Sequence, residues 1–77
     1  MRNLLEFILN RLVDHPDEVS VTEEEINSEM IYTIHVHPDD IARVIGKNGS
    51  VINSIRSIAK VRAIKEQIRA RIQLAEE

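Results

Sequence analysis

The chain has 77 residues and a mass of 8.8 kDa, which predicts one small domain with a limited core. It has no cysteine, so disulfides, thiolate zinc sites and cysteine nucleophiles are excluded. No apolar run reaches the roughly 18 residues of a membrane span, and the first residues do not read as a signal peptide; a cytoplasmic protein is expected. The net charge of −3, taken alone, argues against nucleic-acid binding.

The charge is distributed unevenly along the chain. Residues 1–42 hold two basic and ten acidic residues, a balance of −8, whereas residues 43–77 hold eight basic and three acidic residues, a balance of +5. No acidic residue occurs between residues 41 and 65. Such asymmetry within one small domain indicates that one part of its surface is basic.

The first half of the chain predicts a helix followed by a hairpin. Apolar residues recur on one helical face from Leu4 to Val13, Asn3 is a candidate N-cap, and Pro16 predicts that the helix stops near residues 14–15. Residues 19–26 and 30–37 alternate as strands do, with residues 27–28 as the turn between them. Met30, Tyr32, Ile34 and Val36 form one face of the second strand.

The second half predicts two helices and a segment that the pattern leaves open. A short helix starts near Pro38 and ends at Gly46, and a longer one starts near Ser50. Residues 68–74 alternate as a strand does, yet Ile64, Ile68 and Ile72 also have helical spacing and no Gly or Pro intervenes. With a strand there, the order is α-β-β-α-α-β, an α+β fold with helices on one face of a three-stranded mixed sheet.

Both glycines of the chain lie in one loop, Gly46-Lys47-Asn48-Gly49-Ser50, between the two predicted helices. Glycine permits positive φ and close approach of another molecule, and the following helix directs its free amides and positive dipole end at the loop. Lys47 adds a full positive charge. A phosphate fits this loop better than a metal or a neutral substrate. The alternative is that the Gly-x-x-Gly segment is only a tight corner between two helices and binds no ligand.

The run Arg43-Val44-Ile45-Gly46-Lys47-Asn48-Gly49, followed by Ile52 and Ile55-Arg56, resembles the signature of a KH domain. With the opening helix and the segment from His15 to Val19, the chain is similar to the small bacterial KH proteins of the KhpA family. The resemblance implies a type II KH domain over residues 1–77, with a βααβ core at about 29–75 and an N-terminal helix and strand at 3–26. It also favours a strand at the C-terminus.

The same resemblance implies a function. The ligand would be single-stranded RNA, clamped by the GXXG loop. The family is regarded as probable RNA chaperones that act with a larger multidomain KH protein of the KhpB family and are linked to cell-wall and cell-shape homeostasis. A homodimer is the other expected assembly. Ser50 departs from the basic residue that relatives often carry there, which predicts weaker RNA binding.

The expected RNA contacts come from the loop and the two helices beside it. Amides of residues 46–50 and the Lys47 ammonium would hold phosphates, with bases on nearby aliphatic side chains and further basic residues extending the phosphate path. The candidate residues are Ile41, Arg43, Val44, Ile45, Gly46, Lys47, Asn48, Gly49, Ser50, Arg56 and Lys60. Because Phe7 and Tyr32 are the only aromatic residues, base stacking is not expected to dominate.

Other classes of function find less support in the sequence. His35 and His37 share a strand face near Asp39 and Asp40, but a third aligned ligand is missing, so no metal site is expected. No cofactor, small-molecule substrate, membrane contact or catalytic residue is indicated, and an enzyme is not expected. The alternative to an RNA-binding protein is a protein-interaction or dimerisation module with weak or no RNA binding.

Overall fold

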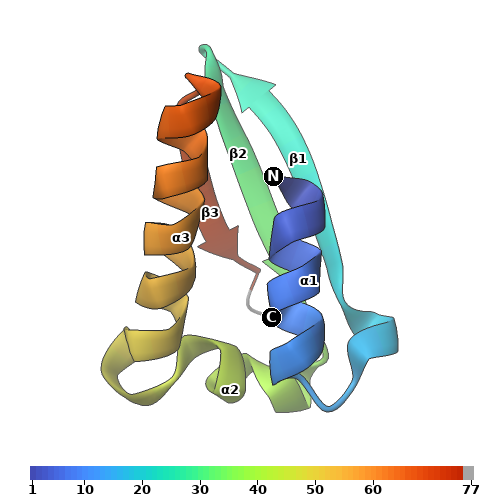
Figure 1. Ribbon diagram of the computed structural model, residues 1–77. Helices are drawn as coiled ribbons and strands as arrows, with labels where there is room; N and C mark the ends of the chain where they lie inside the picture. The colour runs from blue at the N-terminus through green and yellow to red at the C-terminus, as the bar shows by residue number, and fades with distance from the viewer. Residues whose placement is uncertain (76–77) are drawn as a thin grey trace.

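The computed structural model describes residues 1–75 (Figure 1). Its helices are α1 (Arg2–Leu12), α2 (Ile41–Ile45) and α3 (Ser50–Glu66), and its strands are β1 (Ser20–Ile26), β2 (Glu29–His35) and β3 (Ala70–Leu74). Short 3₁₀ turns cover Pro16–Glu18, Pro38–Asp40 and Lys47–Gly49. The expected α-β-β-α-α-β order and the α+β class are confirmed.

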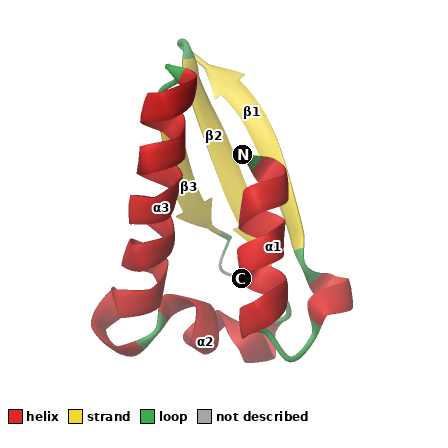
Figure 2. Cartoon of the chain, in the orientation of Figure 1, coloured by secondary structure: helices red, strands yellow, loops and turns green. Residues whose placement is uncertain are grey.

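The sheet has the order β1-β2-β3, so β2 is the central strand (Figure 2). β1 pairs with β2 antiparallel, with Val21 opposite Ile34, and β3 pairs with β2 parallel, with Ile72 opposite Tyr32. A parallel pair needs a crossover between its strands, and α2 and α3 provide it here. The mixed sheet and the C-terminal strand are therefore confirmed, and the helical alternative for residues 68–74 is wrong.

The end of α3 explains how the chain changes from helix to strand without a glycine. Gln67 adopts a left-handed conformation, with φ 58° and ψ 41°, and its amide donates to the carbonyls of Ala63 and Ile64. The amide of Ile68 then donates to Ala63 at 2.9 Å. This is the Schellman arrangement, in which a glycine is usual.

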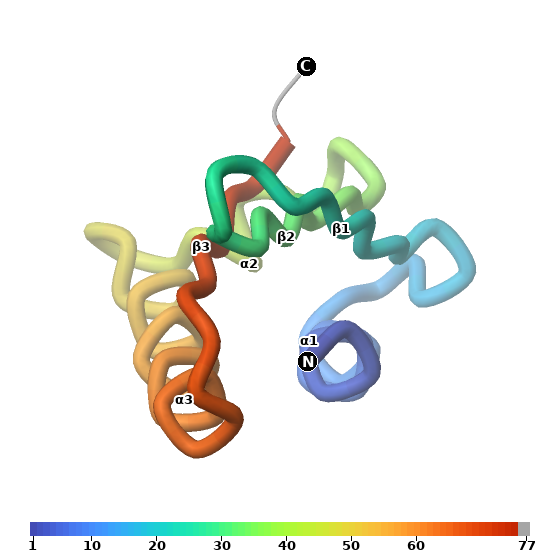
Figure 3. Tube along the Cα trace, turned by 90° about the horizontal axis from the view of Figure 1, so that it is seen from above, coloured from blue at the N-terminus to red at the C-terminus, as the bar shows by residue number. Residues whose placement is uncertain are grey.

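Helices α1 and α3 lie on the same face of the sheet, as predicted (Figure 3). The core between them and the sheet includes Leu5 and Leu9 of α1, Tyr32 and Ile34 of β2, and Ile55 of α3, all nearly or completely buried. Burying each such side chain stabilises the fold by about 1.5–3 kcal/mol. The predicted shared face of residues 30, 32, 34 and 36 is confirmed, since Met30 and Val36 pack against the same core as Tyr32 and Ile34.

The boundaries of α1 differ from the prediction. The helix begins at Arg2 with Met1 as its N-cap, where the Met1 carbonyl accepts the Leu5 amide at 3.1 Å, so the capping role expected of Asn3 is wrong. It ends at Leu12, because Val13 is already extended, with φ −96° and ψ 157°. This leaves a short connection, residues 13–15, before the turn that begins at Pro16.

The hairpin between β1 and β2 has the expected two-residue turn. Asn27 and Ser28 both have positive φ, 52° and 67°, and Ile26 pairs with Glu29. Two-residue turns with positive φ at both positions match the right-handed twist of the strands they join. Among the helices of residues 1–75, none has both the length and the apolar character required to cross a bilayer.

Candidate nucleic-acid interface

The loop between α2 and α3 has a backbone that requires its glycines. Gly46, Asn48 and Gly49 have positive φ angles of 76°, 56° and 77°. A Cβ on Gly46 would lie 2.8 Å from the Val51 amide nitrogen and 2.4 Å from its Cγ2, so a side chain there would displace the start of α3. At Gly49 a Cβ would make ordinary contacts, and only the φ angle favours glycine.

Hydrogen bonding within the loop narrows the set of amides that can bind a ligand. Gly46 donates to the Ala42 carbonyl at 2.9 Å, Gly49 donates to Gly46 at 3.2 Å, and Ser50 donates to Lys47. Within the described residues, the amides of Lys47 and Asn48 have no such backbone partner. Of the five amides expected to hold phosphate, these two are therefore the ones available at the tip of the loop.

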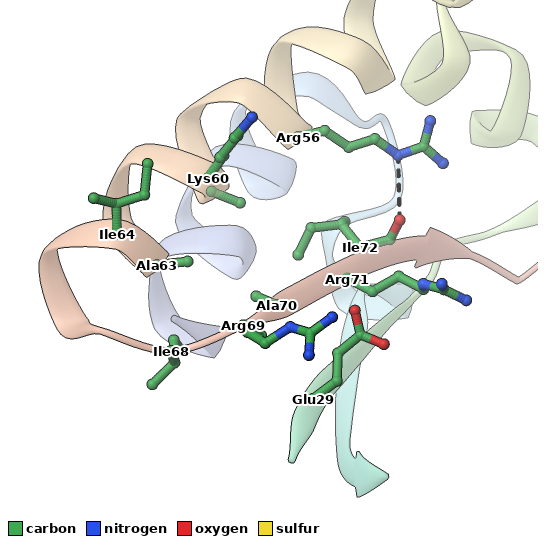
Figure 4. Close-up of a pocket in the computed structure, with 11 residues that line it drawn as sticks. Glu29, Arg56, Lys60, Ala63, Ile64, Ile68, Arg69, Ala70, Arg71 and Ile72 are labelled. Carbon is green, nitrogen blue, oxygen red and sulfur yellow. Dashed lines mark hydrogen bonds between the residues drawn. The ribbon is translucent and has the colours of Figure 1, made fainter. Parts of the chain in front are cut away.

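A groove of about 450 Å³ runs between α3 and β3, where its α3 side extends from Arg56 to Ile64 (Figure 4). Its floor is apolar, with Ala59 and Ile72 nearly buried, while Arg56 and Lys60 reach it from α3. Arg56 spans the groove, because its Nε donates to the Ile72 carbonyl oxygen at 3.2 Å. The full lining is Glu29, Arg56, Ala59, Lys60, Ala63, Ile64, Ile68, Arg69, Ala70, Arg71 and Ile72.

Most of this groove lies outside the residues that the sequence singled out. Arg56 and Lys60 were expected at the interface, whereas Ile64 on α3, Arg69 just before β3 and Arg71 on β3 were not. The alternation of Arg69 and Arg71 with apolar residues was visible in the sequence. The sequence did not show that β3 would run parallel to β2 and so lie beside α3. Four basic side chains and one acidic side chain line the groove, which favours an anionic ligand.

Three aliphatic residues were expected to touch bases, and the structure places them in different surroundings. Val44 is completely buried in the core, so its expected contact with a base is wrong: its side chain has no surface to offer. Ile41 lines a separate hollow with His35 and His37 and does not line the groove between α3 and β3. Ile45 is half-buried beside the loop.

Arg43 is engaged by carboxylates of its own chain. Its Nη2 donates to Asp14 Oδ2 at 2.9 Å, and its Nε lies 3.8 Å from Asp40 Oδ1. Asp40 is itself buried, and its two carboxylate oxygens accept the amides of Asp14 and His15 at 3.0 and 3.1 Å. This network fastens the connection after α1 to the start of α2, and a phosphate would have to compete with it for Arg43.

The same contacts set the protonation of Asp40. Burial is the largest influence and favours the neutral acid, but the amide hydrogen bonds from Asp14 and His15, with the charges of His15 and Arg43, outweigh it. Together they lower the pKa of Asp40 below its ordinary value of 3.8. The carboxylate is therefore ionised at neutral pH and fixes the backbone that precedes the glycine loop.

Comparison of the chain with known proteins identifies its family. The model of the family "KhpA/KhpB, KH domain" matches residues 2–74. The chain is 39% identical over 74 residues to the RNA-binding protein KhpA of Halalkalibacterium halodurans, covering 96% of this chain and 97% of that protein. It is 40% identical to that of Clostridium acetobutylicum over 96% and 99% of the two chains, and 34% identical to that of Listeria monocytogenes over 99% and 100%. No solved structure matches it.

The match covers every helix and strand described above, together with the glycine loop and the groove between α3 and β3. Its extent, and relatives of 34–40% identity along nearly their whole length, agree with the KH signature at residues 43–56. The chain belongs to the KhpA/KhpB family of KH domains.

Proposed function

We propose that the chain binds single-stranded RNA, with phosphates at the tip of the glycine loop and bases along the groove between α3 and β3. The observation that carries the proposal is the loop itself, where the amides of Lys47 and Asn48 lack backbone partners beside the Lys47 ammonium. Backbone amides and a lysine at a helix N-terminus favour phosphate oxygens. The relatives named as RNA-binding proteins support the same ligand.

The groove suits the bases of a single strand better than a duplex. It is apolar along Ala59, Ala63 and Ile72, and it has basic side chains at its rim. Because no aromatic residue lines it, base recognition would rest on aliphatic contact and hydrogen bonds, with the β3 backbone and Arg56 as candidate partners. The family is non-enzymatic, which confirms the expectation that the chain is not an enzyme.

The proposal is tested by replacing the loop tip while both glycines stay in place. In the variant Lys47→Asp with Asn48→Asp, aspartate tolerates the left-handed conformation of residue 48, so the fold is retained. We expect RNA affinity at low salt to fall roughly tenfold or more, measured by fluorescence anisotropy of a short single-stranded RNA, because repulsion replaces phosphate contact.

A matched control replaces a basic residue and the asparagine that follows it elsewhere in the chain. Arg2→Asp with Asn3→Asp alters net charge by the same amount at the start of α1, where acidic residues suit the helix dipole. It should leave RNA affinity nearly unchanged. An equal loss in both variants would assign the effect to net charge, and retained affinity in the folded loop variant would refute binding at the loop.

The finer assignments that follow from the family resemblance are proposals as well. We propose that the chain acts in the cytoplasm as an RNA chaperone or post-transcriptional regulator, with a larger KhpB-type partner or a second copy of itself, in cell-wall and cell-shape homeostasis. A partner surface is favoured by Ile58, Val61 and Ile64 on α3, whose exposed fractions are 47%, 69% and 68%. Exposed apolar residues at helical spacing often mark protein interfaces.

A further inference from the structure

Two histidines and an aspartate meet where the connection after α1 passes the connection after β2. His15 comes from the first connection, and His37 and Asp39 come from the second. One ligand atom from each of the three lies within 4.8 Å of the other two. The sequence could not reveal this cluster, because His15 and His37 are distant along the chain and only the fold brings them together.

The distances within the cluster suit metal coordination better than hydrogen bonding. His15 Nε2 lies 3.8 Å from Asp39 Oδ2, and His37 Nδ1 lies 3.7 Å from the same oxygen. Both separations are too long for a hydrogen bond. Around an ion bound at about 2.0–2.1 Å in tetrahedral geometry, two ligands stand about 3.4 Å apart, so each of these two His–Asp separations needs to shorten by only about 0.3–0.4 Å.

The scaffold fixes the backbone of His15 and leaves the Asp39 side chain adjustable. The His15 amide donates to the buried Asp40 carboxylate at 3.1 Å, which fixes the backbone of that residue. The His37 ring accepts the Asp39 amide at its Nδ1, at 3.0 Å. The Asp39 side chain is 75% exposed and can move to complete a site, whereas the histidine side chains are 40% and 31% exposed.

We propose that His15, His37 and Asp39 form a binding site for a divalent transition-metal ion of the zinc class, with water completing the coordination. Two imidazoles and one carboxylate are a donor set suited to such ions, and none of the three takes part in the RNA contacts proposed above. The bound ion would fasten the α1–β1 connection to the start of α2, beside the network of Asp40 and Arg43.

Binding requires a local rearrangement, which limits the affinity. The two rings are stacked, with centroids 4.1 Å apart and planes inclined by 23°, and nitrogen lone pairs lie in the ring planes. The rings must therefore turn so that both lone pairs converge on one ion. Coordination through His37 Nδ1 also replaces its hydrogen bond from the Asp39 amide.

The test is calorimetric titration of the full, untagged chain with ZnCl₂, since a polyhistidine tag would bind the same ion. We expect one ion per chain. His15→Gln and His37→Asn should each weaken binding roughly tenfold or more, and asparagine at residue 37 can still accept the Asp39 amide. His35→Gln is the matched control, because His35 is the last residue of β2, two residues before His37, and lies outside the cluster; the zinc affinity of this variant should equal that of the wild type.

A second measurement requires no variant. In NMR spectra of the wild-type chain, Zn²⁺ should shift the ring resonances of His15 and His37 and leave those of His35 in place. Equal shifts of all three histidines, no shift of any, or equal weakening by His35→Gln and His15→Gln would overturn the proposal. Zn²⁺ should also raise the melting temperature of the wild type and of His35→Gln but not that of His15→Gln.

Discussion

Asp40 shows how one residue can position a binding loop without touching the ligand. Its carboxylate is 1% exposed and has amide donors from Asp14 and His15. Buried charges persist only where hydrogen bonds or opposite charges compensate for lost hydration, and Asp40 has both. In the sequence it is one of two adjacent acidic residues just after Pro38, where the short helix is predicted to start. Asp40 rather than Asp39 is buried because its carboxylate accepts hydrogen bonds from the connection after α1.

Asp40 predicts a dependence of stability on pH. Since its pKa is lower in the folded chain than its ordinary value of 3.8, its contribution is fully present above that value and is lost as pH falls through the folded pKa. Asp40→Asn should therefore lower the melting temperature at pH 7, and the difference from wild type should shrink as the pH falls below 4.

Thermal unfolding followed by circular dichroism at pH 7, 4 and 3 checks this prediction. Asp17→Asn is the control, because Asp17 is exposed in the turn at Pro16–Glu18. A difference between Asp40→Asn and wild type that stays constant over this range would mean that the charge of Asp40 does not contribute.

At the scale of elements, the end of α3 determines where β3 begins and hence where the groove forms. Gln67 occupies a left-handed position for which glycine has no steric cost. The absence of a glycine there left the C-terminal segment ambiguous in the sequence. The helix nevertheless stops, because β3 gains parallel pairing with β2, beginning at Ala70 opposite Met30.

Gln67→Gly should stabilise the chain by about 0.5–1 kcal/mol, because relief of the left-handed strain exceeds the added freedom of the unfolded chain. The free energy of unfolding in urea measures the effect. Ser57→Gly, in the exposed middle of α3, should instead destabilise the chain by about 0.5–1 kcal/mol. Destabilisation by both substitutions would contradict the proposed strain at residue 67.

At the scale of the whole molecule, the net charge of −3 conceals a separation of charge in space. Glu23, Glu24 and Glu25 lie on the edge strand β1, whereas Arg56, Lys60, Arg69 and Arg71 lie at the groove beside the opposite edge, β3. Charges at the binding surface influence a nucleic acid more than distant ones, because salt screens beyond about 8–10 Å. A negative total is therefore compatible with RNA binding on one face.

The exposed apolar residues of α3 lead to a prediction about assembly. Ile58 and Val61 are exposed and do not line the groove, so Ile58→Gln with Val61→Gln should reduce self-association while RNA binding by each chain persists. Light scattering measures the mass, which should fall from a multiple of 8.8 kDa to a single chain. Ser57→Gln on the same helix is the control, and a wild type that is already monomeric would contradict the homodimer.

The amino-acid sequence by itself determined the features that depend on local chemistry. The helix and strand patterns, the paired glycines and the run from Arg43 to Arg56 follow from neighbours in the chain, and they led to the fold class and the family. Only the tertiary structure decided which residues share a surface. Val44 became core, Arg43 paired with Asp14, and His15 joined His37, because packing of α1 on the sheet brings the connection after it beside the start of α2, although these residues are distant in sequence.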